Sequence, residues 1–207
     1  MDYRIRLTGT EGKKVYIDPE GMEGFYLYPG EVKKSRLTDG MLLSEEDLEK
    51  IRLTYAIPRA KKRALGILVK GDQTTHQLRE KLEKSYHDSR SIEAALEFVT
   101  DAGYVDDLQY ARDYLHSRKH RKSYRMIRMD LAGKGIPSEM LDILFEEEGD
   151  QAREDVEEAV IKYARKFPKT DRAALRKICA HFYRKGYNPE LIQTIVKESH
   201  LIFTLDR

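Results

Sequence analysis

The chain has 207 residues, of which 40% are hydrophobic and 36% are charged, against roughly 25% charged residues in an ordinary globular protein. A formal net charge of +2 does not indicate a nucleic-acid binder by overall charge, and the single cysteine, Cys179, excludes an intramolecular disulfide. No segment reaches the roughly 20 apolar residues needed to cross a bilayer and the N-terminus lacks a signal-peptide pattern, so we expect a soluble, cytoplasmic protein.

The first 56 residues differ in pattern from the rest of the chain. Short β-branched and aromatic runs, separated by glycines, predict a small antiparallel sheet of about three strands. These runs cover residues 3–7, 15–17 and 25–28. A short helical stretch is expected at 31–37, and the sequence at 44–47 resembles a capping box that opens another helix. We therefore expect residues 1–56 to form a β-rich extension with a short helix.

From Pro58 onward the pattern is helical and repeats. Residues 135–144 align with residues 186–195 at a constant offset of 51, and each block contains Lys-Gly, a hydrophobic residue, a two-residue N-cap and an amphipathic helix. The upstream pair Ile127 and Leu131 recurs at the same offset as Ile178 and Phe182. A looser copy without Lys-Gly lies between residues 78 and 99.

Each repeat is expected to contain three helices, and because so small a unit cannot bury its apolar face alone, the repeats should pack in series. The predicted fold is mainly α, with three tandem three-helix repeats in an elongated curved array and a small N-terminal antiparallel β extension. The repeats are assigned to residues 57–105, 106–149 and 150–207. The helices are placed at residues 59–70, 75–85, 89–101, 107–121, 123–133, 138–148, 151–166, 171–185 and 189–199.

The sequence contains no convergent set of catalytic residues. The segment Gly9–Lys14 lacks the glycine spacing and the closing Ser or Thr of a phosphate loop, which favours a hairpin turn. His116 and His120 could share a helix face as metal ligands, but no third ligand stands at helical spacing. Cys179 lies among apolar residues, which favours packing over nucleophilic chemistry. We therefore expect no enzymatic activity, no catalytic residue, no metal and no cofactor.

The charge distribution is more informative than the net charge. Residues 115–129 contain six basic residues and no acid, whereas residues 139–158 contain ten acids and one base. A passive helix surface usually interleaves Glu with Lys, so an acid-free cluster favours contact with phosphates of a nucleic acid or nucleoprotein. The predicted nucleic-acid- or filament-binding residues are Arg118, Lys119, Arg121, Lys122, Arg125 and Arg128, assisted by Arg172, Arg176, Lys177, Arg184 and Lys185.

A series of short motifs in the middle of the chain resembles the central signature of the RecX family of regulatory proteins. These motifs are Gly103–Asp107, Tyr110-Ala111, Ser117-Arg118, Arg125–Ile127, Leu131 and Lys134–Ile136. Leu78, Leu82 and Ile92 resemble the first repeat of that family, and Lys185–Tyr187 resembles its third, so the likeness covers most of the chain. One departure is the segment 119–124, which has no Gly or Pro where the family often has a glycine-rich turn.

The resemblance implies a three-repeat helical fold and control of the RecA recombinase in DNA repair, homologous recombination and the SOS response. Such proteins bind the groove of the RecA–DNA filament and hinder its growth, strand exchange and ATP turnover. The expected partners are the RecA filament, and single- and double-stranded DNA bound weakly and without sequence specificity. We expect a monomer with no membrane partner. The alternative is a stand-alone DNA-binding protein with helix-turn-helix-like units, against which the scarcity of Asn and Gln in the basic segments argues.

Overall fold

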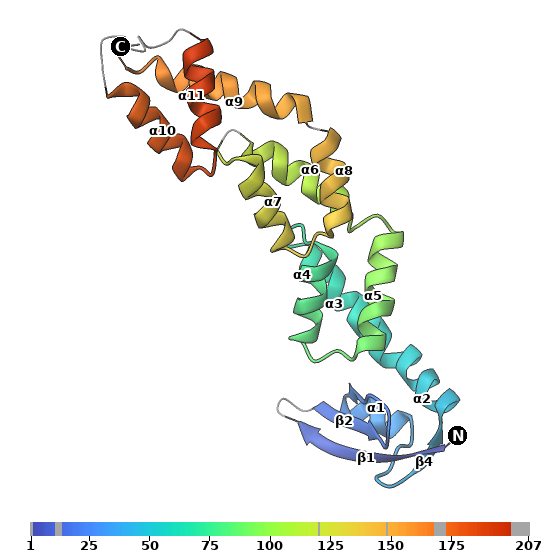
Figure 1. Cartoon of the computed structure of the whole chain (residues 1–207). Coiled ribbons are helices and arrows are strands. Elements are labelled where there is room, and N and C mark those ends of the chain that lie inside the picture. Colours follow the sequence, from blue (N-terminus) through green and yellow to red (C-terminus); the bar gives the residue numbers. More distant parts are fainter. Residues whose placement is uncertain (1, 11–13, 120, 148, 168–172, 200–207) are drawn as a thin grey trace. The chain divides into compact units, whose positions relative to one another are not determined.

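The computed structural model describes residues 2–10, 14–119, 121–147, 149–167 and 173–199, and it divides into two compact units, Met1–Asp106 and Asp107–Arg207 (Figure 1). The predicted fold class is confirmed, since the chain is mainly helical and begins with a small antiparallel sheet. Within the described residues no helix is both long enough and apolar enough to span a membrane. The predicted serial arrangement of the repeats and their boundaries remain predictions.

The sheet has one more strand than the sequence pattern predicts. Its strands are β1 (Asp2–Thr10), β2 (Lys14–Pro19), β3 (Phe25–Leu27) and β4 (Leu42–Ser44), in the antiparallel order β3-β2-β1-β4. The short β4 has no alternation of its own and is defined by its partner, because Leu43 pairs with Tyr3 of β1. One face of the sheet buries Ile5, Ile17 and Phe25 against the first helices.

After the short helix α1 (Pro29–Lys34), one uninterrupted helical run leads from the sheet into the first three-helix group. It consists of α2 (Glu45–Ile51), a π turn (Arg52–Ala56) and α3 (Ile57–Leu68). The predicted cap is confirmed, since the Asp47 backbone N–H donates to Ser44 Oγ at 3.1 Å. The predicted helix at residues 59–70 corresponds to α3, but it is not a separate helix, because the run that begins at Glu45 continues into it. Proline usually marks a helix boundary, but here the π turn just before Pro58 accommodates the proline without ending the helix.

The first unit is completed by α4 (Thr75–Glu83) and α5 (Ser89–Asp101), and Figure 1 shows α5 alongside α3. Thr74 and Asp88 cap these two helices through their side-chain oxygens. The buried core of this group consists of alanines at the close contacts of α3 and α5 and larger aliphatic residues around them. Its members include Ala60, Ala64, Leu78, Leu82, Ile92, Ala95 and Val99.

A buried arginine joins the sheet region to the helices. Arg52 is only 4% exposed; its guanidinium donates to the Glu23 carbonyl and to the Glu49 carboxylate, each at 3.1 Å. Its Nε lies 3.1 Å from Asp88, which is an ion pair whose angle is not that of a hydrogen bond. Because Asp88 also caps α5, one cation connects the β2–β3 loop, α2 and α5.

The second unit contains two three-helix groups, each with its own core (Figure 1). The first is α6 (Asp107–Arg118), α7 (Tyr124–Ala132) and α8 (Ser138–Glu147); the second is α9 (Gly149–Ala164), α10 (Ala174–Arg184) and α11 (Pro189–Glu198).

The 51-residue repeat of the sequence has a structural basis. Gly135 and Gly186 both adopt the left-handed conformation, with φ of 82° and 87°, which a side chain rarely accepts. The helices that follow begin at Ser138 and Pro189, which preserves the offset. Each glycine therefore marks the same tight turn between the second and third helices of its group.

Candidate nucleic-acid interface

The basic segment occupies the end of α6, the α6–α7 turn and the first turns of α7. The turn has no glycine, and the N–H groups of Arg121 and Lys122 both donate to the Arg118 carbonyl, at 2.8 and 3.0 Å. Ser123 is buried and caps α7, accepting the Met126 N–H at 3.3 Å. The missing glycine therefore does not prevent a well-formed turn.

Three of the six basic residues in this segment are paired with acids that come from other parts of the fold. Lys119 lies 2.9 Å from Asp155 of α9, Lys122 pairs with Asp130 of α7, and Arg128 pairs with Asp142 of α8. The sequence of residues 115–129 contains no acid, but the fold brings acids into contact with its cations. Because their charges are already balanced, these three cations contribute mainly to the structure of the second unit.

Lys122 belongs to a small polar cluster with Asp130 and Tyr114. The Tyr114 hydroxyl donates to Asp130 Oδ2 at 3.0 Å, beside the Lys122 ammonium. The hydrogen bond from Lys122 lowers the pKa of Asp130, and the bond to Asp130 raises the pKa of Lys122. Burial, followed by the contact with Asp130, raises the pKa of Tyr114. Asp130 is therefore ionised at neutral pH and holds the Lys122 charge.

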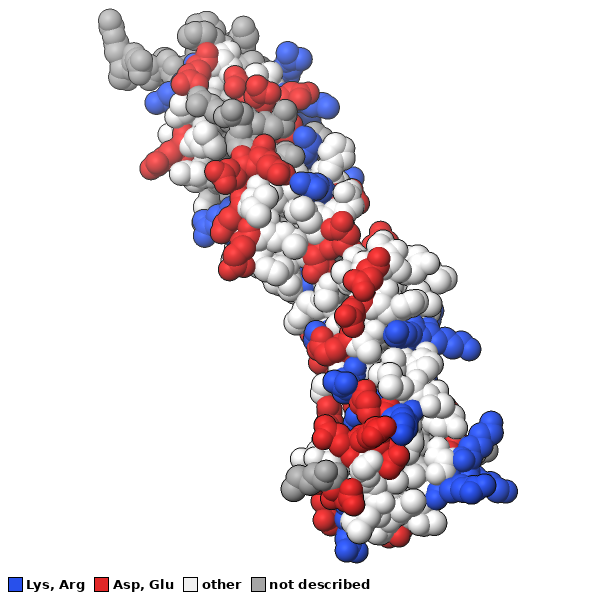
Figure 2. Space-filling view, turned by 90° about the vertical axis from the view of Figure 1, so that its right-hand side faces the viewer, with Lys and Arg blue, Asp and Glu red and all other residues white. Residues whose placement is uncertain are grey.

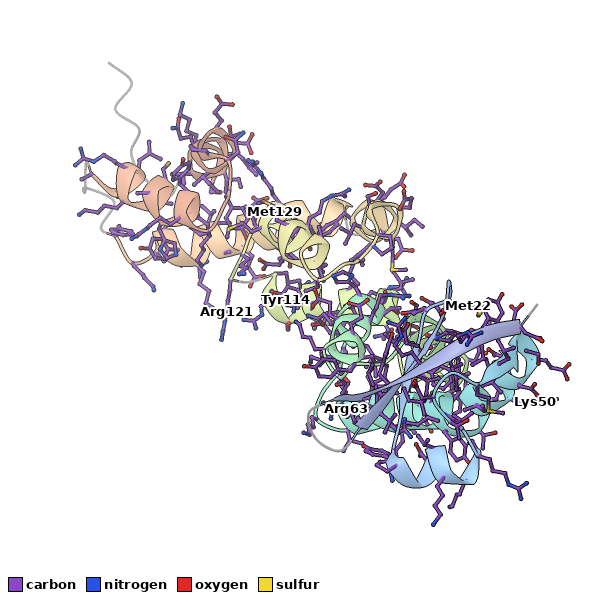
Figure 3. The ribbon with its side chains drawn as sticks, turned by 90° about the horizontal axis from the view of Figure 1, so that it is seen from below. Met22, Lys50, Arg63, Tyr114, Arg121 and Met129 are labelled. Atoms are coloured by element: carbon purple, nitrogen blue, oxygen red, sulfur yellow. The ribbon has the colours of Figure 1, made fainter. Side chains whose placement is uncertain are left out.

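The other three basic residues, Arg118, Arg121 and Arg125, are exposed. Arg118 lies with its guanidinium carbon 5.7 Å from the ring centroid of Tyr114. Figure 3 shows Arg121 at the edge of the unit, pointing away from the helices. Within the described part of the chain none of these three arginines has an acidic partner. They are the members of the predicted segment that can meet an anionic ligand.

The predicted residues of the third repeat also differ in their surroundings. Arg176 and Arg184 are exposed on α10, where the Arg184 Nε donates to the Ala180 carbonyl at 3.3 Å. Lys177 lies over the ring of Phe167 at 5.8 Å. Burial, and then the nearby charge of Lys166, lowers the pKa of Lys185, which is half-buried. Arg172 lies outside the described residues.

A groove of about 900 Å³ lies where the α10–α11 turn meets the start of α7. The Ser123 N–H donates to the Lys185 carbonyl at 3.0 Å, and the Tyr187 hydroxyl donates to the Lys122 carbonyl at 3.1 Å. The lining is mostly apolar and carries one cation, the predicted residue Arg125. The described lining residues are Ser123, Tyr124, Arg125, Val156, Tyr183, Gly186, Tyr187, Asn188, Pro189 and Leu191.

Tyr183 and Leu191 are exposed in this groove, and neither was predicted as a site residue from the sequence. Tyr183 is 66% exposed although it sits on an amphipathic helix with a buried stripe. Its position one residue after buried Phe182 could have identified it as an aromatic residue on the polar side of α10.

The alternative chemistries considered in the sequence have little support in the fold. Cys179 is part-buried against the core of the third group, and burial raises the pKa of its thiol, which makes it a poor nucleophile. His120, the second of the two candidate metal ligands, lies outside the described residues. In the part of the chain that is described, no group of three or more potential metal ligands occurs. Strands β1 and β2 pair antiparallel on either side of residues 11–13, as a hairpin requires.

Acidic side chains gather over much of one face of the second unit (Figure 2). The acids of α8 and α9 that are exposed include Glu139, Glu146, Glu154, Glu157 and Glu158. The exposed arginines and these acids thus give one unit both a cationic and an anionic surface.

Comparison with known proteins supports one family. The family model described as "RecX, second three-helix domain" matches residues 106–143, which cover α6, α7 and the start of α8. The "Regulatory protein RecX" of Listeria monocytogenes serotype 4a is 26% identical over 199 residues, covering 94% of this chain and 73% of the relative. That of Clostridium acetobutylicum is 27% identical over 195 residues, covering 89% and 88%.

Two solved structures share the fold. A crystal structure of a regulatory protein RecX superposes with a TM-score of 0.58 at 21% identity, covering 94% of this chain and 99% of that one. The crystal structure of RecX from Lactobacillus salivarius has a TM-score of 0.61 at 22% identity, covering 71% and 98%. The motifs in the middle of the chain, the matched three-helix domain and the relatives that align with most of this chain agree, and they make the chain similar to the RecX family of regulatory proteins.

Proposed function

We propose that this chain regulates the RecA recombinase, as an inhibitor that binds the RecA–DNA filament and thereby modulates DNA repair and homologous recombination. The observation that carries the site assignment is the group of exposed arginines, Arg118, Arg121 and Arg125, left without acidic partners among the described residues. The contact is phosphate-driven and not base-specific, because arginines on a turn and a helix face attract phosphates of any sequence.

The proposed surface extends from these arginines across the groove to Arg184 of α10. The hydrogen bond between Ser123 and Lys185 holds the two segments together, so that Arg125 lies on the groove rim near the end of α10. An apolar groove next to cations suits a protein-coated filament, which offers apolar side chains as well as phosphates, better than naked DNA. Beside this surface, Lys119 is mostly buried and Lys122 and Arg128 are partly exposed, and each is paired with an acid.

The charge distribution favours the filament over DNA alone. With a net charge of +2 and the acidic face of α8 and α9, the chain has little long-range attraction for a bare duplex. We therefore propose weak, sequence-independent binding to single- and double-stranded DNA and tighter binding to the filament. The protein acts as a cytoplasmic monomer and catalyses no reaction itself, in keeping with the name "regulatory protein" of its relatives.

The test is inhibition of the ATP hydrolysis of RecA on single-stranded DNA by the variant Arg121→Glu with Arg125→Glu. The matched control is Arg165→Glu with Lys197→Glu, which makes the same charge change at exposed positions of the same unit. We expect the first variant to lose inhibition at a concentration where the parent and the control inhibit fully, with equal helix content by circular dichroism.

Two results would contradict the proposal. If the folded Arg121 and Arg125 variant inhibits as the parent does, the site is assigned to the wrong surface. If the protein co-sediments with DNA alone as strongly as with the joint RecA–DNA filament, the alternative of a stand-alone DNA-binding protein with helix-turn-helix-like units is favoured.

A further inference from the structure

The first unit contains a second basic surface, far in sequence from the segment discussed above. A pocket of about 360 Å³ opens where the sheet, α3 and the α4–α5 turn meet, and we refer to it as the Tyr86 pocket. It combines basic and aromatic side chains, and none of its described lining residues is acidic. These residues are Lys14, Tyr26, Tyr28, Arg59, Arg63, Lys84, Ser85, Tyr86 and His87.

Two cations of the Tyr86 pocket, Lys14 and Arg63, contact aromatic rings and a hydroxyl group. The Lys14 ammonium lies 4.4 Å from the ring centroid of Tyr26 and 5.1 Å from that of Tyr86. The Arg63 Nε donates to Ser85 Oγ at 3.2 Å, and Figure 3 shows Arg63 at the surface of the first unit. A neutral hydroxyl leaves the Arg63 charge available to an anion.

Acids pair with two of the pocket's cations. Glu31 pairs with Arg59, whose guanidinium also lies 4.8 Å from the Tyr26 ring. Glu80 lies 4.0 Å from the Lys84 ammonium, the limit of an ion pair, and Lys84 is exposed. Arg63, by contrast, has no acidic partner among the described residues.

His87 lies in the wall of the pocket, near its cations. Burial, followed by the Arg59 charge, lowers the pKa of His87 to about 4, and Lys14 and Arg63 act in the same direction. The neighbouring carboxylate of Asp88 acts in the opposite direction and is outweighed. The imidazole is thus neutral at physiological pH and can be packed beside a bound ligand.

Tyr86 itself has a strained backbone. Its φ is 63°, in the left-handed region that disfavours a bulky side chain, and its side chain is 77% exposed. The two other three-helix groups place Gly135 and Gly186 at the corresponding position. The same hydrogen bond closes each of the three turns. The residue after the Tyr86, Gly135 or Gly186 position donates its N–H to the carbonyl of a buried residue that lies four positions before that position. These bonds are His87 to Leu82 at 3.4 Å, Ile136 to Leu131 at 3.2 Å and Tyr187 to Phe182 at 3.1 Å.

Glycine would satisfy this turn in the first group as it does in the other two, so the tyrosine is not required by the fold. An exposed aromatic ring that is kept at the cost of backbone strain, next to cations, indicates a binding role. We infer that the Tyr86 pocket binds single-stranded nucleic acid, with a base stacked on the Tyr86 ring and the flanking phosphates held by Arg63 and Lys84.

A single strand fits this chemistry better than a duplex. Stacking on a protein ring requires an unstacked base, which a single strand presents and a duplex keeps inside. Cations alone would bind the phosphates of a duplex equally well, and the exposed Tyr86 ring would then make no contact with a base. The Tyr86 pocket lies in the first unit, whereas the exposed arginines of the proposed function lie in the second, so the inference adds a second site for the weak single-strand binding of the proposed function and rests on that part of it.

The first test compares Tyr86→Gly with Tyr86→Phe by fluorescence anisotropy of a labelled oligothymidine, using the full chain without RecA. We expect Tyr86→Gly to weaken binding by about tenfold, since one base–aromatic stack is lost, while Tyr86→Phe binds as the parent does. The melting temperature of Tyr86→Gly should equal or exceed that of the parent because the backbone strain is relieved. Parent-like binding by a folded Tyr86→Gly overturns the inference.

The second test measures the charge contribution with Arg63→Gln plus Lys84→Gln. Its matched control is Lys62→Gln plus Lys70→Gln, two exposed cations of α3 and its C-terminal end outside the pocket. Removal of two phosphate contacts should reduce the log–log salt slope for oligothymidine by roughly 1.4, and the control should leave it unchanged.

Three results of these measurements would overturn the assignment. The first is an equal reduction of the salt slope in the control variant. The second is duplex binding that is as tight as single-strand binding and insensitive to Tyr86→Gly. The third is displacement of oligothymidine by inorganic phosphate at matched ionic strength, which would indicate a small-anion site. Inhibition of RecA by the same variants, measured separately, shows whether the surface at Arg121 and Arg125 still works, so the two proposals fail independently.

Discussion

The ammonium of Lys119 lies 2.9 Å from the carboxylate of Asp155, and the two side chains are only 13% and 9% exposed. The Tyr124 hydroxyl donates to the same carboxylate at 3.3 Å. A cation in the middle of a basic segment is therefore withdrawn from the surface and joins α6 to α9. A run of basic residues in the sequence therefore does not show that each of their charges is accessible to a ligand.

The first prediction is that Lys119→Met destabilises the second unit by about 3 kcal/mol, because it leaves the Asp155 charge buried without its cation. The double variant Lys119→Met with Asp155→Leu should recover most of the loss, since both charges are removed. Urea denaturation followed by circular dichroism measures both variants. Arg121→Met is the control and should change stability by less than about 0.5 kcal/mol. Equal destabilisation by the single and double variants would show that packing, and not the charge, decides the effect.

The second prediction concerns Gly186. A Cβ at this position would lie 2.7 Å from both Met126 Sδ and Ser123 Oγ, and φ is 87°. Backbone strain and the collision with α7 together should make Gly186→Ala destabilising by about 2–4 kcal/mol. The control in the same unit is Gly133→Ala, where the nearest atom would be 3.4 Å away and φ is −64°. Denaturation curves in urea should show Gly133→Ala as neutral or slightly stabilising, and a comparable loss in both variants would contradict the argument.

The third prediction is a loss of stability of the first unit in weak acid. The unfolded chain protonates His87 near its ordinary pKa of 6.5, whereas the folded state, through burial and then Arg59, does so only at about 4. The neutral form of His87 therefore makes its full contribution to the free energy of unfolding above pH 6.5, and this contribution is lost as the pH falls from 6.5 to 4. After allowance for partial exposure we expect a loss on the order of 1–2 kcal/mol.

Hydrogen exchange in peptides of α4 and α5, corrected for the intrinsic effect of pH, measures this change. In His87→Gln the part of the decrease between pH 6.5 and 4 that comes from His87 should disappear. Protection that falls equally in the parent and in His87→Gln would assign the acid sensitivity to other groups.

The fourth prediction is that Arg52→Met destabilises the first unit by about 3–5 kcal/mol, since Asp88 is left buried without its cation. This loss of stability should also appear as faster hydrogen exchange in the β2–β3 loop and at the start of α5, because Arg52 connects these two segments. Arg90→Met is the comparison, because Arg90 also pairs with Glu49 but its side chain is 65% exposed. A small, purely local effect of Arg52→Met would contradict the connecting role.

Much of the fold could be predicted because its constraints are local. The 51-residue offset is visible in the sequence since Gly135 and Gly186 are required by their left-handed backbone. Most helix ends lie within a few residues of their predicted positions for the same reason, as at the caps Ser44 and Asn188. The π turn and β4 could not be predicted, because the first depends on how the chain accommodates Pro58 and the second on a partner strand 38 to 42 residues away.

The candidate site was only partly predictable. The basic run at 118–128 is a local feature of the sequence. The acids that neutralise Lys119, Lys122 and Arg128 stand 36, 8 and 14 residues away, and only the packing of the helices brings them together. The Tyr86 pocket was missed because its residues come from separate stretches of the chain, which only the fold brings together.

The uninterrupted helical run from Glu45 to Leu68 has a consequence for how the N-terminal sheet can be exchanged or removed. A truncation at residue 57 would not cut at a linker. It would remove the Ser44 cap and Arg52, and leave the first turn of α3 with unpaired N–H groups. The sheet and α3 are therefore joined by one continuous helix, and a version shortened at residue 57 needs a new cap for the start of α3.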